Sequence, residues 1–67
     1  MKLSARNQLE GRVTLVKAGP INAEVVIDAG GQTITSIISL DALEELGIKE
    51  GSTVTALFKA SSVLLMA

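Results

Sequence analysis

Apolar and polar residues alternate along the first half of the chain in three short runs, residues 7–16, 22–28 and 32–38. A two-residue period is typical of half-buried β-strands, because successive side chains of a strand point to opposite faces of the sheet. Turn sequences separate the runs, Ala18-Gly19-Pro20 after the first and Ala29-Gly30-Gly31 after the second. The pattern therefore predicts three consecutive strands joined as a meander.

The first predicted strand carries a glycine on its apolar face. The side expected to face the core consists of Leu9, Gly11, Val13 and Leu15. A glycine at an inward position commonly marks a bulge or a sharp bend. We therefore expect the first strand to bulge and bend at Gly11 as it passes between two parts of the sheet.

The two-residue period ends near residue 39, where leucines begin to recur every three residues. These leucines are Leu40, Leu43 and Leu46. Ser39 stands before them as a favourable helix N-cap, and Gly47 follows them as a favourable C-terminal stop. The segment predicts a helix of two turns.

Two further apolar runs follow the predicted helix. Residues 53–58 alternate like the earlier strands, and residues 63–66 are predicted to form a short fifth strand. Five strands with a helix between the third and the fourth are the element order of an OB-type barrel, and this helix favours it over an SH3-like barrel. The sequence predicts an all-β fold: a small five-stranded OB-like barrel with one short helix, formed by a single domain over residues 1–67.

The composition predicts that the chain assembles with copies of itself. A chain of 67 residues buries only about 60% of the surface that its unfolded form exposes, so one copy alone is marginally stable. The sequence has no cysteine for disulfides and no histidine for a zinc site, while 48% of its residues are apolar and 19% are charged. One small core cannot hide this much apolar surface, and we expect an obligate homo-oligomer with apolar interfaces.

Several functional classes are disfavoured by charge and motif content. The net charge of −1 provides no field that recruits nucleic acid or an anionic membrane, and no apolar stretch is long enough to span a bilayer. The start of the chain lacks the apolar block of a signal peptide, so we expect a cytoplasmic protein. Catalytic motifs and cation-ligand spacings are absent from the sequence, and we expect neither an enzyme nor a cofactor.

Hydroxyl groups and cations gather near both ends of the chain. Ser4 and Arg6 precede the first predicted strand, and Lys59 and Ser61 follow the fourth. Hydroxyls, backbone N–H groups and a planar guanidinium are the donors that a small tetrahedral oxyanion needs, because such an anion accepts hydrogen bonds in every direction. The alternatives are a solvated arginine and a lysine that protects a sheet edge from aggregation.

Two segments together resemble the molbindin family, small molybdate-binding proteins whose domain also occurs in molybdate transporter ATPases and molybdate-responsive regulators. They are Ser4-Ala5-Arg6-Asn7, continued by Leu9-x-Gly11-x-Val13, and the late Lys59-Ala60-Ser61. The resemblance covers essentially the whole chain. It implies an OB-like fold and reversible binding of molybdate or tungstate at subunit interfaces for intracellular molybdenum storage. It also implies a hexamer built as a trimer of dimers.

Carried over residue by residue, the resemblance implies the following oxyanion ligands: Ser4, Arg6, Asn7, Ser39, Lys59, Ala60 through its backbone N–H, and Ser61. Ser39 matches a position at which a neighbouring subunit contributes a hydroxyl, and a role as helix N-cap explains the same residue. The family has more than one class of site, formed where subunits meet. The loop of Gly19, Pro20, Ile21 and Asn22 is a candidate for the second class, although turn chemistry also accounts for it.

Two functions of other classes remain as alternatives. OB barrels often bind oligonucleotides, but they use stacking aromatic residues in a basic groove, and the single aromatic residue, Phe58, falls on the apolar face of its strand. The other alternative is a purely structural oligomerisation module.

For an oxyanion site, neutral donors with one arginine suit any fully deprotonated dianion, including molybdate, tungstate and sulfate. The choice of molybdate follows from the resemblance alone.

Overall fold

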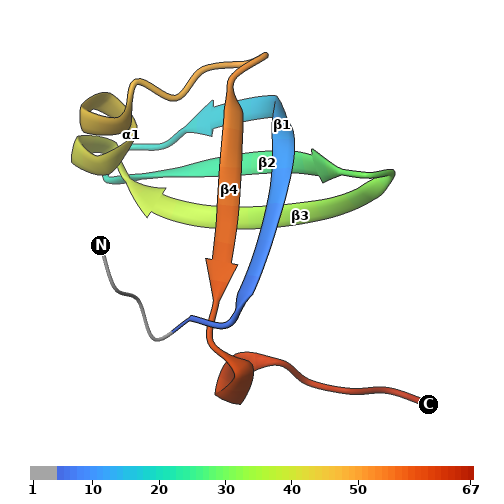
Figure 1. Cartoon of the computed structure of the whole chain (residues 1–67). Helices are drawn as coiled ribbons and strands as arrows, with labels where there is room; N and C mark the ends of the chain where they lie inside the picture. Colours follow the sequence, from blue (N-terminus) through green and yellow to red (C-terminus); the bar gives the residue numbers. More distant parts are fainter. Residues whose placement is uncertain (1–4) are drawn as a thin grey trace.

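The computed structural model describes residues 5–67, so the predicted ligand Ser4 lies outside the described residues. The elements in this range are β1 (Asn7–Ala18), β2 (Asn22–Ala29), β3 (Gln32–Ser39), α1 (Leu40–Leu46), β4 (Thr53–Phe58) and the 3₁₀ turn η1 (Ala60–Ser62). The strands form one antiparallel sheet in the order β3-β2-β1-β4. The sheet curls so that β4 crosses over β2 and β3 (Figure 1). The mostly-β class and the position of the helix are confirmed.

The core lies on one face of β2. Ala23, Val25 and Ile27 are buried, as the alternation predicts, and Val13 of β1 joins them. Half-buried apolar side chains pack against this cluster from the other elements: Val16, Ile34, Ile38, Leu43, Ile48, Val54 and Ala56. The core therefore draws on every strand, on the helix and on the segment between α1 and β4.

β1 contains an irregularity, but not at the predicted position. Its pairing with β2 shifts register between Val13 and Leu15, so β1 has one extra residue at Thr14. An extra residue moves every following side chain to the opposite face. Val13 is 1% exposed, whereas Leu15 is 45% exposed, and Val16 takes the inward position instead. The prediction that Leu15 faces the core is wrong.

Gly11 permits a close approach of two strands rather than forming the bulge. A Cβ atom at this residue would stand 2.5 Å from Cγ2 of Ile27 and 2.7 Å from the carbonyl oxygen of Asp28. β1 changes partners here, because it pairs with β4 up to Arg12 and with β2 from Arg12 onward. The bend of β1 between these partners is visible in Figure 1. The absence of a side chain at Gly11 lets β1 and β2 pack at this distance.

The helix begins and ends where the sequence predicts. The Ser39 hydroxyl accepts a hydrogen bond from the backbone N–H of Ala42 at 3.0 Å. Gly47 adopts a left-handed conformation with φ of 62°, and the N–H of Ile48 donates to the carbonyl of Leu43 at 3.2 Å. Such bonds satisfy terminal groups that a helix cannot satisfy internally.

No helix among the described residues has the length and apolar character needed to cross a membrane.

The predicted fifth strand is wrong. Lys59 is followed by the turn η1, in which the N–H of Val63 donates to the carbonyl of Ala60 at 3.3 Å, and residues 63–67 form no strand. This segment runs away from the sheet to the C-terminus (Figure 1). An apolar run forms a strand only beside another strand that supplies backbone partners, and the turn directs this run away from its own sheet. The described chain therefore has a four-stranded sheet.

Candidate oxyanion sites

The strand pairing unites the two halves of the sequence motif. Asn7, the first residue of β1, pairs with Phe58, the last residue of β4. Arg6 precedes Asn7 and Lys59 follows Phe58, so the two cations lie at the same end of the β1–β4 pair. Both side chains are exposed, while Asn7 is half-buried. Two cationic residues far apart in the sequence are thereby placed at the same end of the sheet.

The turn η1 adds backbone donors and hydroxyls beside these cations. Its internal bonds use the N–H groups of Ser62, which donates to the carbonyl of Lys59 at 2.9 Å, and of Val63. The N–H groups of Ala60 and Ser61 come earlier, and the first N–H groups of any helical turn have no acceptor within it. Both residues are exposed. We call Arg6, Asn7, Lys59, Ala60 and Ser61 the strand-end cluster.

Arg6, Lys59, Ala60 and Ser61 of the strand-end cluster are open to water on this one chain, and only Asn7 is half-buried. Exposed charges contribute little to binding in water, because the high dielectric constant weakens them and holding a long side chain in place costs entropy. The same donors act more strongly where another surface excludes water. The geometry therefore favours an anion site that becomes effective when a second molecular surface covers it.

A second group of predicted residues meets at the β1–β2 connection. The N–H of Gly19 donates to the carbonyl of Asn22 at 2.8 Å, and the N–H of Leu40 donates to the carbonyl of Ile21 at 3.1 Å. Asn22 also pairs with Ser39 across β2 and β3. The N-cap residue Ser39 therefore belongs with this loop in space, and its hydroxyl hydrogen is not used in capping Ala42.

This loop borders a shallow pocket of about 460 Å³, lined by residues 17–24 and Ile37. Its lining includes Lys17, a cation that the sequence interpretation did not select. Glu24 is the register partner of Lys17 across β1 and β2, so a residue of opposite charge stands opposite it on the neighbouring strand. The missed signal was a lysine directly before the turn sequence, which the alternating pattern explains equally well as a surface position of a strand.

The two groups are not brought together within one chain. Figure 1 shows the start of β1 and the end of β4 at one end of the molecule, away from α1, while the β1–β2 connection and the end of β3 lie beside α1. Ser39 therefore does not join the strand-end cluster of its own chain. Among residues 5–67, histidine, cysteine and carboxylate side chains form no group that could hold a metal ion.

Comparison with known proteins supplies the family. A model described as the TOBE domain matches residues 3–65. The chain belongs to the TOBE domain family. It is 57% identical over 68 residues to Molybdenum-pterin-binding protein 1 of Clostridium pasteurianum, with 100% of both proteins covered.

Solved structures agree with this membership. A molybdate-binding protein from Sporomusa ovata is 34% identical and has a TM-score of 0.96, with 100% of both chains covered. The cytoplasmic molybdate-binding protein ModG, solved with molybdate bound, is 45% identical with a TM-score of 0.91, covering 96% of this chain and 46% of ModG. The resemblance of this TOBE-family chain to the molbindins, predicted from two short motifs, is confirmed.

Proposed function

We propose that the chain binds molybdate and tungstate reversibly at interfaces between copies of itself and serves as an intracellular store of molybdenum. One observation carries the proposal: the pairing of Asn7 with Phe58, which places Arg6 beside Lys59 and the donors of η1. The names of the relatives support the ligand, because they describe molybdate or molybdenum-pterin binding. The ligands proposed for this site are Ser4, Arg6, Asn7, Lys59, Ala60 and Ser61.

Each group in the strand-end cluster has a distinct part in this proposal. The guanidinium of Arg6 donates two parallel hydrogen bonds to two oxygens of one anion, and Lys59 adds a compact positive charge. The N–H groups of Ala60 and Ser61 and the Ser61 hydroxyl take the remaining oxygens. The guanidinium, the ammonium group and the backbone N–H groups only donate, and the Ser61 hydroxyl acts as a donor in this proposal, so the set favours a dianion without a proton over hydrogen phosphate, whose hydroxyl needs an acceptor.

The proposed site is completed by a second copy of the chain. The exposure of the strand-end cluster and the distance of Ser39 from it in the fold support this step. In the assembly, the Ser39 hydroxyl of one copy donates to an anion held by the strand-end cluster of another. We propose a hexamer, arranged as a trimer of dimers. Anion binding then stabilises the assembly by mass action, because the bound anion holds two copies together.

We propose the pocket beside Gly19, Pro20, Ile21 and Asn22 as a second class of oxyanion site. Lys17 at its border supports the proposal, since it supplies a positive charge to a loop that otherwise offers backbone and amide donors. The pairing of Lys17 with Glu24 makes this the weaker of the two sites.

We propose a cytoplasmic binding protein without catalytic activity. The relatives are named as binding proteins, and ModG is described as cytoplasmic. Phe58 supports the same choice over oligonucleotide binding, because it is half-buried and lines an apolar groove rather than standing free for base stacking. The proposed assembly has no cofactor and no membrane or nucleic-acid partner.

The variant Arg6→Ala tests the strand-end cluster. Charge-assisted hydrogen bonds contribute about 2 kcal/mol, so molybdate affinity measured by isothermal titration calorimetry should fall roughly 30-fold. Lys49→Ala is the matched control, because Lys49 is an exposed cation near the other end of β4 and its loss should leave the affinity unchanged. Equal affinities for Arg6→Ala and the unmodified protein, with assembly intact, would remove Arg6 from the site.

A further inference from the structure

The end of β4 is supported by one neighbouring strand. β4 stands at the edge of the sheet, and in the described part of the chain it pairs with β1 alone. The last pair of this ladder joins Phe58 to Asn7, and Lys59 and η1 follow it directly. The ends of secondary-structure elements open most easily, because they have backbone partners on fewer sides. Backbone pairing by itself therefore fixes Lys59 and η1 only weakly.

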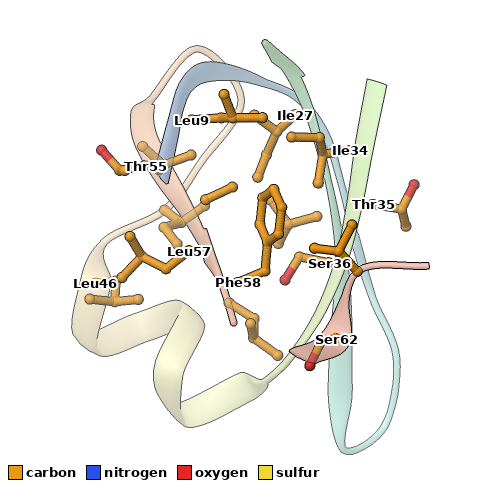
Figure 2. A pocket seen from close by; sticks show the side chains of 16 residues that line it. Leu9, Ile27, Ile34, Thr35, Ser36, Leu46, Thr55, Leu57, Phe58 and Ser62 are labelled. Atoms are coloured by element: carbon orange, nitrogen blue, oxygen red, sulfur yellow. The ribbon is translucent and has the colours of Figure 1, made fainter. Parts of the chain in front are cut away.

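The ring of Phe58 supports the end of β4 from a second direction. It points into the middle of the apolar groove, toward Ile27 of β2 and Ile34 of β3 (Figure 2). This groove has a volume of about 640 Å³, and its lining side chains are apolar or carry hydroxyls. Phe58 is half-buried and is the single aromatic residue of the sequence. Aromatic rings bury large apolar areas, so the ring joins the end of β4 to two further strands.

The same groove extends to η1. Ser62 and Val63 border it, and their N–H groups donate the two hydrogen bonds that close the turn. The N–H of Ser62 donates to the carbonyl of Lys59 at 2.9 Å, and the N–H of Val63 donates to the carbonyl of Ala60 at 3.3 Å. Short 3₁₀ turns have poorer hydrogen-bond geometry than α-helices, and within the described residues the side chain of Lys59 adds no capping bond. The residue before Lys59 and the residues after Ser61 therefore border one groove.

We propose that Phe58 is a positioning residue of the strand-end cluster. Its ring, packed in the apolar groove, fixes the end of β4 and the start of η1, so that Lys59 and the donors of η1 converge with Arg6. The ring itself does not contact the anion. Donors that are fixed before binding lose less conformational entropy when the anion arrives, and the affinity is higher for that reason. This role rests on the proposed function, and it names the apolar side chain on which the geometry of that site depends.

Val54 distinguishes this role from that of an ordinary core residue. It lies on the same face of β4, borders the same groove and is half-buried, but it pairs with Gly11 near the opposite end of the β1–β4 ladder. Phe58→Leu and Val54→Ala each remove a few carbon atoms from the groove, so both should lower the free energy of unfolding. Of the two, only Phe58→Leu should disturb the strand-end cluster.

Hydrogen exchange followed by NMR tests the positioning in the absence of any anion. The N–H of Ser62 is bonded within η1, whereas the N–H of Gly51 donates to the carbonyl of Val13 at 2.8 Å near the other end of β4. We expect Phe58→Leu to raise the exchange rate of Ser62 relative to Gly51 about ten-fold, and Val54→Ala not to raise this ratio. A ratio in Phe58→Leu no higher than in Val54→Ala would overturn the proposal. A Ser62 N–H that exchanges without protection in the unmodified protein would overturn it as well.

Isothermal titration calorimetry with molybdate tests the consequence for binding. We expect the affinity to fall about three-fold in Phe58→Leu and about ten-fold in Phe58→Ala, in the order of the apolar surface removed, and to stay within about two-fold in Val54→Ala. Native mass spectrometry establishes which variants keep the oligomeric state of the unmodified protein. Loss of that state already in Phe58→Leu would contradict the proposal, because the ring would then act through contacts between copies.

The two measurements distinguish a failure of the positioning role from a failure of the proposed function. Molybdate binding with equal affinity in the unmodified protein and in Phe58→Leu would refute the role of Phe58 and leave the proposed function standing. An equal loss of affinity in Phe58→Leu and Val54→Ala would also refute it, because general destabilisation would explain both. An unmodified protein that binds no molybdate would refute the proposed function, and with it the role of Phe58 in binding, even where exchange at Ser62 depends on the ring.

Discussion

The close approach of β1 and β2 at Gly11 makes Gly11→Ala a sensitive test of the fold. The added Cβ would meet Cγ2 of Ile27 at 2.5 Å and the carbonyl oxygen of Asp28 at 2.7 Å. Both distances are shorter than van der Waals contact, and the second partner is backbone, which cannot rotate away. Overpacking of this kind costs about 1–3 kcal/mol, and the reduced entropy of the unfolded chain returns up to about 1 kcal/mol. We expect a net loss of about 2 kcal/mol.

Urea unfolding followed by circular dichroism measures this loss. All variants must be compared at one protein concentration, because assembly makes the apparent free energy of unfolding depend on concentration. Gly30→Ala is the matched control, since Gly30 has φ of 61° and no atom within 4 Å of a built Cβ. It should lose about 1 kcal/mol through backbone strain alone.

A double-mutant cycle identifies the contact responsible. Ile27→Ala removes Cγ2, so combining it with Gly11→Ala should cost about 1 kcal/mol less than the sum of the two single changes. The carbonyl contact of Asp28 persists, so relief should be incomplete. Gly30→Ala should be additive with Ile27→Ala. The reasoning would be refuted by a Gly11→Ala variant as stable as the unmodified protein, or by strict additivity with Ile27→Ala.

Further substitutions test the two ends of the helix. Ser39→Ala removes the hydroxyl that accepts a hydrogen bond from the Ala42 N–H at 3.0 Å. The free energy of unfolding should fall by about 1 kcal/mol. Molybdate binding should weaken as well, because Ser39 is proposed to complete the site of a neighbouring copy. Ser39→Asp should restore the stability but not the binding, because a carboxylate caps the helix and repels an oxyanion; full molybdate affinity in this variant would contradict the proposed role of Ser39. Gly47→Ala forces a side chain into φ of 62° and should cost about 1 kcal/mol in thermal or urea unfolding without changing molybdate affinity; unchanged stability would contradict the left-handed helix end.

Local signals in the sequence predict most of the fold. The alternation of β2 identifies Ala23, Val25 and Ile27 as buried, because one strand face meets the core along its whole length. Ser39 and Gly47 mark the helix ends through chemistry that acts within a few residues. In both cases the structural outcome depends on neighbours in the sequence.

The errors arise where the outcome depends on distant residues. The inserted residue at Thr14 turns Leu15 outward, and nothing within β1 itself distinguishes this position from Gly11 as the site of a bulge. The segment 63–66 has the composition of a strand, but a strand also needs a free edge beside it, and η1 directs this segment elsewhere. A sequence pattern indicates that a segment tends to form a strand, but it does not indicate which neighbouring strand the segment pairs with.

For the candidate site too, the sequence indicates what short motifs determine and does not indicate how distant segments are placed relative to one another. The motif halves that contain Arg6 and Lys59 predict a shared location, and the register of β1 with β4 brings them to one end of the sheet. Lys17 was not selected, although it stands directly before the turn sequence, because the alternating pattern explains it equally well as a surface position of a strand. Ser39 lies with that loop rather than with Arg6, and the sequence alone contains no signal for this separation.

Native mass spectrometry of the purified chain, equilibrated with molybdate and separately with sulfate at the same concentration, tests the central claim most directly. The proposed function predicts one discrete oligomer that gains a fixed number of molybdate masses and no sulfate. A monomer, or an oligomer that remains free of molybdate, would contradict it.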